Sequence, residues 1–147
     1  MARIRITKVF HFEAAHALHG YPGKCAQIHG HSYELQVTVI GTPIADPDHP
    51  FTGMVMDFSE LKRIVKERVI DRYDHALLLS RRSVPDLFPR RELFARIEVM
   101  DRQPTCEHMI EDVAASLEGA LPEGVQLHAL RLVETPTSFA EWCVEEN

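Results

Sequence analysis

The sequence predicts an α+β fold in which two helices cover one face of a four-stranded antiparallel sheet. Two segments with strand-like patterns follow one another near the N-terminus without a helix between them, which favours antiparallel pairing. Two later segments carry apolar residues at helical spacing, and each begins at a capping residue. The chain has 147 residues, the size of one domain, so we expect 1–147 to fold as a single unit.

The first two strands are expected at 4–18 and 31–42, on either side of a loop rich in glycine and proline at 19–28. Aromatic and β-branched residues favour extended structure in the first strand. In the second, apolar side chains alternate with polar ones from Tyr33 to Val39. One face of this strand is therefore expected to be dry and the other polar.

The first helix is expected to begin at the cap Asp57 and to run to about Tyr73, and the second to begin at the cap Thr105. Pro122 and Gly124 are expected to end the second helix.

Two further strands are expected, one at 94–100 before the second helix and one at 125–133 after it. With both helices on one sheet face, the other face is left partly apolar. We therefore expect an oligomer that covers it.

Composition and charge exclude several classes of function. A net charge of −6 argues against a nucleic-acid partner. No apolar run is long enough to span a bilayer, and residues 1–5 lack the hydrophobic segment of a signal peptide. Three cysteines without framework spacing indicate reduced thiols and a cytoplasmic location.

A thiol and two imidazoles lie within seven residues, from Cys25 to His31. His29 and His31 are two apart, so in a strand both side chains point to one face, where they can share a metal ion. Cys25 can act there as a ligand or as a nearby base. His16 follows the small residues Ala14 and Ala15, which leave room for an ion, and is our candidate third ligand.

Two other segments allow more than one interpretation. Asp74-His75 at the end of the first helix can be a cap with surface charge, or a proton-handling pair in which the carboxylate orients the imidazole. The segment 80–92 contains Arg81, Arg82, Arg90 and Arg91. It can be a solvated loop or an anion-binding lid, since arginine matches phosphate geometry.

Taken together, the motifs resemble the 6-pyruvoyl-tetrahydropterin synthase family, which includes the bacterial 6-carboxy-5,6,7,8-tetrahydropterin synthases of the queuosine pathway. The resemblance covers nearly the whole chain and rests on the order and spacing of six segments. These are Phe12-Glu13-Ala14-Ala15-His16, Cys25 to His31, Gly53-Met54-Val55-Met56-Asp57-Phe58, Asp74-His75, Pro104-Thr105-Cys106-Glu107 and Glu134-Thr135.

The resemblance implies the T-fold (tunnelling fold), in which a four-stranded antiparallel sheet carries two helices on one side. Members of the family form trimeric barrels that usually stack into hexamers. Their active sites, which bind a pterin, lie between subunits.

The resemblance also implies a role for each site residue. His16, His29 and His31 look like the ligands of a zinc ion (Zn2+), and Cys25 looks like the catalytic base. Asp74 and His75 match the rest of a proton-transfer triad, contributed by a neighbouring subunit. Three further residues match the pterin site: Glu134, which holds the ring, and Thr105 and Glu107, which line the pocket.

The family substrate is 7,8-dihydroneopterin triphosphate. One branch eliminates triphosphate and forms the pyruvoyl product; the other releases acetaldehyde and triphosphate and forms 6-carboxy-5,6,7,8-tetrahydropterin. The three-residue gap between Cys25 and His29, together with the Phe-Glu-Ala-Ala-His segment, resembles the carboxy branch.

Three departures from the family pattern concern the rim of the pocket and the exact substrate. Leu79 stands where the family usually has asparagine, Gln103 replaces an asparagine, and the stretch that carries the arginines is longer. A diverged pterin enzyme that accepts an unphosphorylated side chain is one alternative. The others are a non-catalytic zinc module with Cys25 as fourth ligand, and a zinc hydrolase, for which no His-Glu-x-x-His segment is present.

Overall fold

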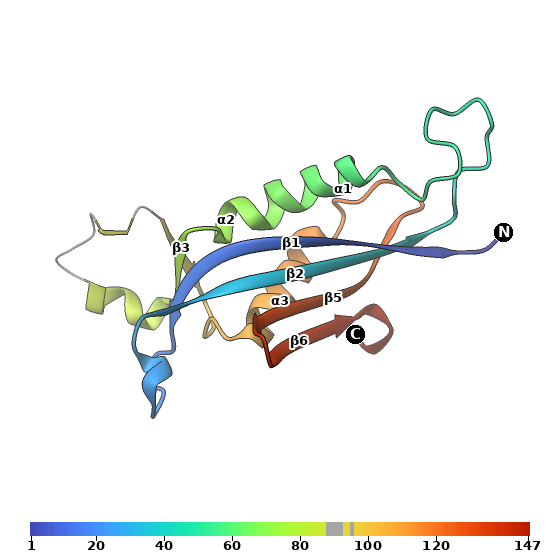
Figure 1. The fold of residues 1–147 in the computed structure, drawn as a ribbon. Helices are drawn as coiled ribbons and strands as arrows, with labels where there is room; N and C mark the ends of the chain where they lie inside the picture. Colours follow the sequence, from blue (N-terminus) through green and yellow to red (C-terminus); the bar gives the residue numbers. More distant parts are fainter. Residues whose placement is uncertain (88–92, 95) are drawn as a thin grey trace.

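The structure is a computed structural model that describes residues 1–87, 93–94 and 96–147. Its framework is a six-stranded sheet with the strand order β4-β3-β1-β2-β5-β6. The strands are β1 (Ile4–Ala17), β2 (His29–Gly41), β3 (Ala76–Ser80), β4 (Ile97–Met100), β5 (Gln126–Thr135) and β6 (Ser138–Cys143). The helices lie on one side of the long β1–β2 ribbon (Figure 1).

The helical segments are α1 (Phe58–Val65), the π-helical turn η2 (Lys66–Ile70), α2 (Asp71–Tyr73) and α3 (Cys106–Leu117). Short 3-10 turns occur at η1 (Lys24–Ala26), η3 (Arg81–Leu87) and η5 (Val144–Glu146). The first three helical segments are continuous, so the helix expected from Asp57 to about Tyr73 is confirmed. Asp57 caps it by accepting a hydrogen bond from the backbone N–H of Ser59.

Strands β1 and β2 form a long antiparallel pair whose register runs without a break from Ile4 opposite Gly41 to His16 opposite His29. The antiparallel pairing expected for these strands is confirmed. Near the end of the pair, a Cβ atom at Gly30 would lie 3.3 Å from the carbonyl oxygen of Ala14, so a larger residue would crowd β1.

The main core lies between the helices and one face of this sheet. Inward side chains of β1 and β2 meet the apolar stripe of α1 and η2 and that of α3. The largest fully buried side chains include Phe12, Tyr33, Leu35, Leu61, Tyr73, Leu78, Met109 and Leu117. This agreement of strand and helix patterns confirms the α+β class.

The expected four-stranded antiparallel sheet is wrong in detail, because the sheet is mixed and has two additional strands. β3 pairs in parallel with β1 and with β4, and β6 pairs with β5. All five residues of β3 are buried, so the strand shows no polar–apolar alternation and its sequence resembles the end of a helix. β4 is also shorter than the strand expected at 94–100, since it begins at Ile97.

The second helix ends earlier than expected. α3 stops at Leu117, and Gly119 then adopts a left-handed backbone with φ of 70°. A glycine in that conformation is a common helix terminator, and it acts here before Pro122 is reached.

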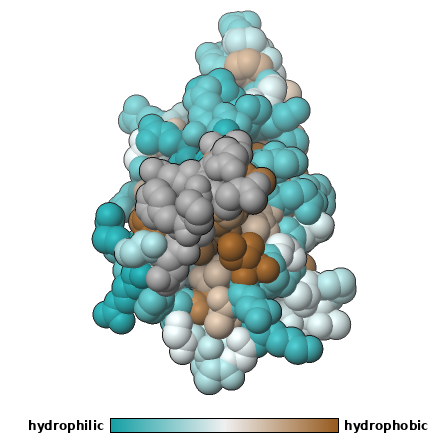
Figure 2. Space-filling view, turned by 90° about the vertical axis from the view of Figure 1, so that its left-hand side faces the viewer, coloured by the Kyte–Doolittle hydropathy of each residue, from teal (hydrophilic) through white to brown (hydrophobic). Residues whose placement is uncertain are grey.

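A second, smaller apolar cluster lies on the opposite face of the sheet, around Ala17, Leu77 and Leu79, with Phe94 and Ile97 packed against it. Figure 2 faces this end of the molecule and shows an apolar patch exposed there. Among the described residues, no helix combines the length and the apolar character needed to cross a bilayer.

Candidate active site

Three histidines converge on the helix-covered face of the sheet, at the end of the β1–β2 pair. His16 and His29 are register partners, and His31 lies two residues further along β2 on the same face. One ring nitrogen from each lies within 4.8 Å of the others. His16 is only 3% exposed, and burial lowers its pKa, so the neutral imidazole that a metal ion requires is favoured.

Backbone carbonyls fix the orientation of two of these rings. The Nδ1 atom of His16 lies 2.7 Å from the carbonyl oxygen of Pro104, and Nδ1 of His29 lies 2.7 Å from that of Gln27. Because a carbonyl only accepts, each Nδ1 donates, which leaves a lone pair on each Nε2. This is the arrangement in which metal-binding histidines are usually held.

The remaining nitrogens fit a metal ion. The Nε2 atoms of His16 and His29 are 3.0 Å apart, too close for two facing lone pairs without a proton or a cation between them. Nε2 of His31 is buried and has no hydrogen-bond partner among the described residues. Three imidazoles with one open position are typical of a catalytic divalent-metal site.

A cavity of about 230 Å³ adjoins the histidines and gathers most of the other residues singled out in the sequence. Cys25, Thr105, Glu107 and Glu134 all line it, together with His16 and His29. Cys25 reaches this place because its carbonyl accepts a 2.8 Å hydrogen bond from Leu18, which draws the turn η1 against the end of β1.

Cys25 lies beside the histidines without joining their ligand group, which, among the residues that the structure describes, consists of the three imidazoles. A second thiol, Cys106, lines the same cavity. Burial raises the pKa of the Cys106 thiol to about 12, and the charge of Glu134 adds to the effect. Cys106 therefore stays protonated near neutral pH, and its S–H donates to the Leu132 carbonyl.

Glu134 follows the last residue of β5 that pairs with β2, at a place where the register between β5 and β6 shifts. Such a bulge re-aims a side chain. Oε1 of Glu134 lies 3.8 Å from Nε2 of His31, and the Glu134 side chain is 24% exposed. One carboxylate is thus shared between the histidine cluster and the cavity.

Thr105 and Glu107 are held by the start of α3. The Thr105 hydroxyl caps this helix by accepting a 3.3 Å hydrogen bond from the N–H of His108. Glu107 is an exposed residue of the first helical turn. The Thr105 side chain is therefore engaged in the helix, while both residues border the cavity.

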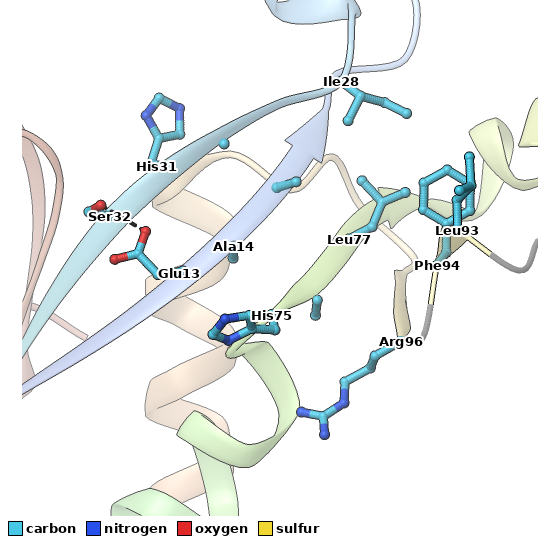
Figure 3. Close-up of a pocket in the computed structure, with 13 residues that line it drawn as sticks. Glu13, Ala14, Ile28, His31, Ser32, His75, Leu77, Leu93, Phe94 and Arg96 are labelled. Carbon is cyan, nitrogen blue, oxygen red and sulfur yellow. Dashed lines mark hydrogen bonds between the residues drawn. The ribbon is translucent and has the colours of Figure 1, made fainter.

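Asp74 and His75 lie elsewhere in this chain, beside a second cavity of about 580 Å³ that His75 lines (Figure 3). The Asp74 carboxylate accepts a 3.0 Å hydrogen bond from the N–H of Glu13 and lies 3.1 Å from Nδ1 of His75. The Glu13 hydrogen bond and then His75 hold the pKa of Asp74 below its usual range. His75 has φ of 57°, an unusual value for a residue with a side chain.

The departures from the family pattern have structural explanations. Leu79 is 1% exposed and belongs to the second apolar cluster. The side-chain amide of Gln103 pairs with the backbone N–H and carbonyl of His19, which ties the segment before α3 to the end of β1. Arg81 pairs with Asp101 at 2.8 Å. Arg82 is exposed, and Arg90 and Arg91 lie outside the described residues.

Sequence reasoning missed one residue beside this site. Tyr33 is 1% exposed, and its ring centroid lies 5.6 Å from that of His31. Burial, followed by the charge and hydrogen-bonding capacity of Glu134, raises the pKa of Tyr33 well above its ordinary value. In the sequence Tyr33 is one more apolar position in an alternating strand, so only the fold shows its place.

Comparisons with known proteins agree on one family. A family model described as 6-pyruvoyl tetrahydropterin synthase matches residues 5–145. A 6-carboxy-5,6,7,8-tetrahydropterin synthase of Haemophilus influenzae is 34% identical over 94% of this chain and 97% of its own. One from Synechocystis is 34% identical over 93% of this chain and 91% of its own.

Solved structures show the same fold at lower sequence identity. An uncharacterised protein from Wolinella succinogenes superposes with a TM-score of 0.80 at 19% identity and covers 98% of this chain and 99% of its own. The 6-pyruvoyl tetrahydropterin synthase of Caenorhabditis elegans gives a TM-score of 0.62 at 23% identity, with 97% and 96% covered.

Proposed function

The chain belongs to the 6-pyruvoyl tetrahydropterin synthase family, and on that premise we propose that it converts 7,8-dihydroneopterin triphosphate and water to 6-carboxy-5,6,7,8-tetrahydropterin, acetaldehyde and triphosphate. The observation that carries this proposal is the cavity in which Cys25 and Glu134 meet the histidine cluster. Relatives named for this product match along more than nine tenths of the chain. The product belongs to the queuosine (7-deazapurine) pathway in the cytoplasm.

His16, His29 and His31 hold the metal in this proposal, and the metal is zinc, which three neutral imidazoles suit. Zinc supplies a Lewis acid that makes protons on the hydroxyl-bearing side chain of the substrate easier to remove. The carbonyls of Pro104 and Gln27 hold two of the ligand rings in the required orientation.

Cys25 acts as the general base. Its side chain faces the cavity beside His16 and His29 but is outside the ligand group, so the thiol is free to take a proton. A neighbouring cation favours the thiolate over the thiol. Cys106 in the same cavity is held in its neutral form and does not compete for this role.

Glu134 holds the pterin ring. A carboxylate can accept two parallel hydrogen bonds from the amino and ring N–H groups of a 2-amino-4-oxo pterin. In a largely buried pocket, a ligand without these donors would leave the carboxylate unpaired and would bind poorly. Thr105 and Glu107 border the ring site from the start of α3.

Asp74 and His75 act on the site of a neighbouring subunit. In one chain His75 lines a cavity other than the one that Cys25 lines, and Asp74 lies beside His75. The proposal therefore requires an oligomer, a trimer or a hexamer, in which chains of residues 1–147 act as single domains and share active sites. His75, oriented by Asp74, returns a proton to the substrate.

The test is to incubate zinc-loaded protein with 7,8-dihydroneopterin triphosphate and to identify the products by mass. Acetaldehyde together with the carboxypterin supports the proposal. A pyruvoyl-tetrahydropterin product would place the chain in the other branch of the family. If this substrate gives no product, the proposal is overturned. The remaining interpretations are then a diverged pterin enzyme and a non-catalytic metal module.

A further inference from the structure

The hydroxyl of Tyr33 is a buried polar group without a partner. Tyr33 is 1% exposed, and no hydrogen-bond partner for its hydroxyl lies at bonding geometry among the described residues. Its ring is fixed by stacking on Phe12, with 4.9 Å between centroids and 13° between planes. A buried hydroxyl that makes no hydrogen bond is costly, which points to a partner that moves into place.

The strand register identifies that partner as Glu134. The last paired residues of β2 and β5 at this end are Glu34 and Val133. The next residues along the two antiparallel strands, Tyr33 and Glu134, are therefore opposite each other. Side chains in that relation have Cβ atoms about 4.5–5.5 Å apart and reach each other directly.

Glu134 needs such a restraint because it is close to the metal ligands. Its Oε1 lies 3.8 Å from the buried Nε2 of His31. A carboxylate at that distance can join the three imidazoles as a fourth ligand, which would close the position that a catalytic site keeps open. The Cys106 thiol does not restrain the Glu134 carboxylate, because the Cys106 S–H donates to the carbonyl oxygen of Leu132 at 3.3 Å.

We propose that Tyr33 is a positioning residue whose hydroxyl donates a hydrogen bond to the Glu134 carboxylate and keeps that carboxylate away from the metal and turned to the cavity. Stacking on Phe12 holds the Tyr33 ring, so rotation of the partly exposed Glu134 side chain completes the bond. The inference rests on the proposed function only for the identity of the substrate that Glu134 faces. The effect of Tyr33 on the metal site does not depend on any substrate.

The experiment replaces zinc by cobalt(II) and compares the visible spectra of wild type and Tyr33→Phe. Without the hydroxyl, Glu134 joins the metal, so the cobalt spectrum changes and metal affinity, measured by chelator competition, rises about tenfold. Adding Glu134→Gln to Tyr33→Phe returns both readouts to wild-type values. An unchanged spectrum and affinity in a folded Tyr33→Phe protein would overturn the proposal.

Tyr73→Phe is the matched control. Tyr73 is also fully buried, and its hydroxyl donates to the carboxylate of Asp112, which is not among the residues of the histidine site. The same chemical change there is expected to leave the cobalt spectrum and the metal affinity unchanged. A spectral change in Tyr73→Phe equal to that in Tyr33→Phe would indicate a general loss of packing and would overturn the proposal.

If Tyr33→Phe does not fold, the variant Glu134→Gln alone still tests the proposal. In wild-type protein the restrained Glu134 is not a ligand, so Glu134→Gln alone should leave the cobalt spectrum unchanged. A change would show that Glu134 already binds the metal, against the proposal. These outcomes stand even if 7,8-dihydroneopterin triphosphate is not turned over, so failure of the proposed function can be told apart from failure of this inference.

Discussion

The two faces of the sheet carry different parts of the candidate chemistry. On the helix-covered face, three histidines, Cys25 and Glu134 come together around one cavity within a single chain. On the opposite face, the His75 side chain is 79% exposed beside a cavity bordered by apolar side chains such as Leu77 and Phe94. The first face gathers the residues to which we assign metal and substrate binding, whereas the second presents the pair to which we assign proton transfer, beside a cavity that His31 also lines.

The difference separates the residues that one chain brings together by folding from those that the proposal assigns to the site of a neighbouring subunit. The ligand geometry follows from strand register and from carbonyls of the same chain, so a lone chain should bind metal. The role proposed for Asp74 and His75 requires another subunit. Variants on the two faces should therefore separate metal binding from turnover.

The largest effect is expected on the helix-covered face from His29→Ala. Removing one of three ligands leaves too few nitrogens to hold the ion, so metal affinity and turnover should both fall by about a thousandfold or more. Metal analysis of purified protein and product formation measure the two effects. His11→Ala, at an exposed strand position, is the control and should retain both. Full metal content in His29→Ala would contradict the ligand assignment.

Cys25→Ala should keep the metal and lose turnover by about a hundredfold to ten-thousandfold, since a general base contributes that range. Metal content and initial rate are measured on the same preparation. Cys143→Ala, at the end of β6, is the matched control, because Cys143 does not line the cavity. Loss of the metal with Cys25→Ala would instead support a structural site with four protein ligands.

On the opposite face, His75→Ala should reduce turnover by about a hundredfold without changing metal content. The sharper measurement mixes His75→Ala chains with Cys25→Ala chains after dissociation and reassembly. If an active site takes Cys25 from one chain and His75 from another, some sites in the mixture are intact and activity returns. Activity no greater than that of the two variants alone would indicate that each chain uses its own residues.

The smallest expected effect concerns stability and pH. The pKa of Asp74 is lowered in the folded protein, first by the Glu13 N–H and then by His75. Its contribution to stability is therefore present above the ordinary carboxyl pKa and is lost as pH falls through the lowered value. Denaturant unfolding at a series of pH values should show this loss in wild type and not in Asp74→Asn. The two proteins should differ by less than about 1 kcal/mol in the free energy of unfolding that is lost at low pH. Equal pH dependence in both proteins would count against the interaction.

Much of the helix-covered face could be predicted from local pattern. The two-residue spacing of His29 and His31 fixes a common face once the segment is a strand, and the structure brings His16 to the same place through strand pairing. The start of α3 could be predicted from Thr105, because a helix cap is a local feature of the sequence. The common face of His29 and His31 and the cap at Thr105 share one cause, since periodicity and capping act over a few residues.

The opposite face could not be predicted in this way. β3 is buried along its whole length, so its residues carry no alternation, and its parallel pairing with β1 depends on contacts far apart in the sequence. The separation of Asp74 and His75 from Cys25 follows from that pairing. Tyr33 was missed for a related reason, because its partner Glu134 lies on a strand about one hundred residues away.

The unbroken register of β1 and β2 limits how the protein can change in length. Side chains alternate between faces along a strand, so one residue inserted between Phe12 and His16 would turn His16 to the other face. The same slip would expose Phe12 or its neighbours. Within β1 and β2, a one-residue insertion or deletion is therefore expected to disturb the core and the histidine cluster together, whereas the loop between the two strands lies outside this register.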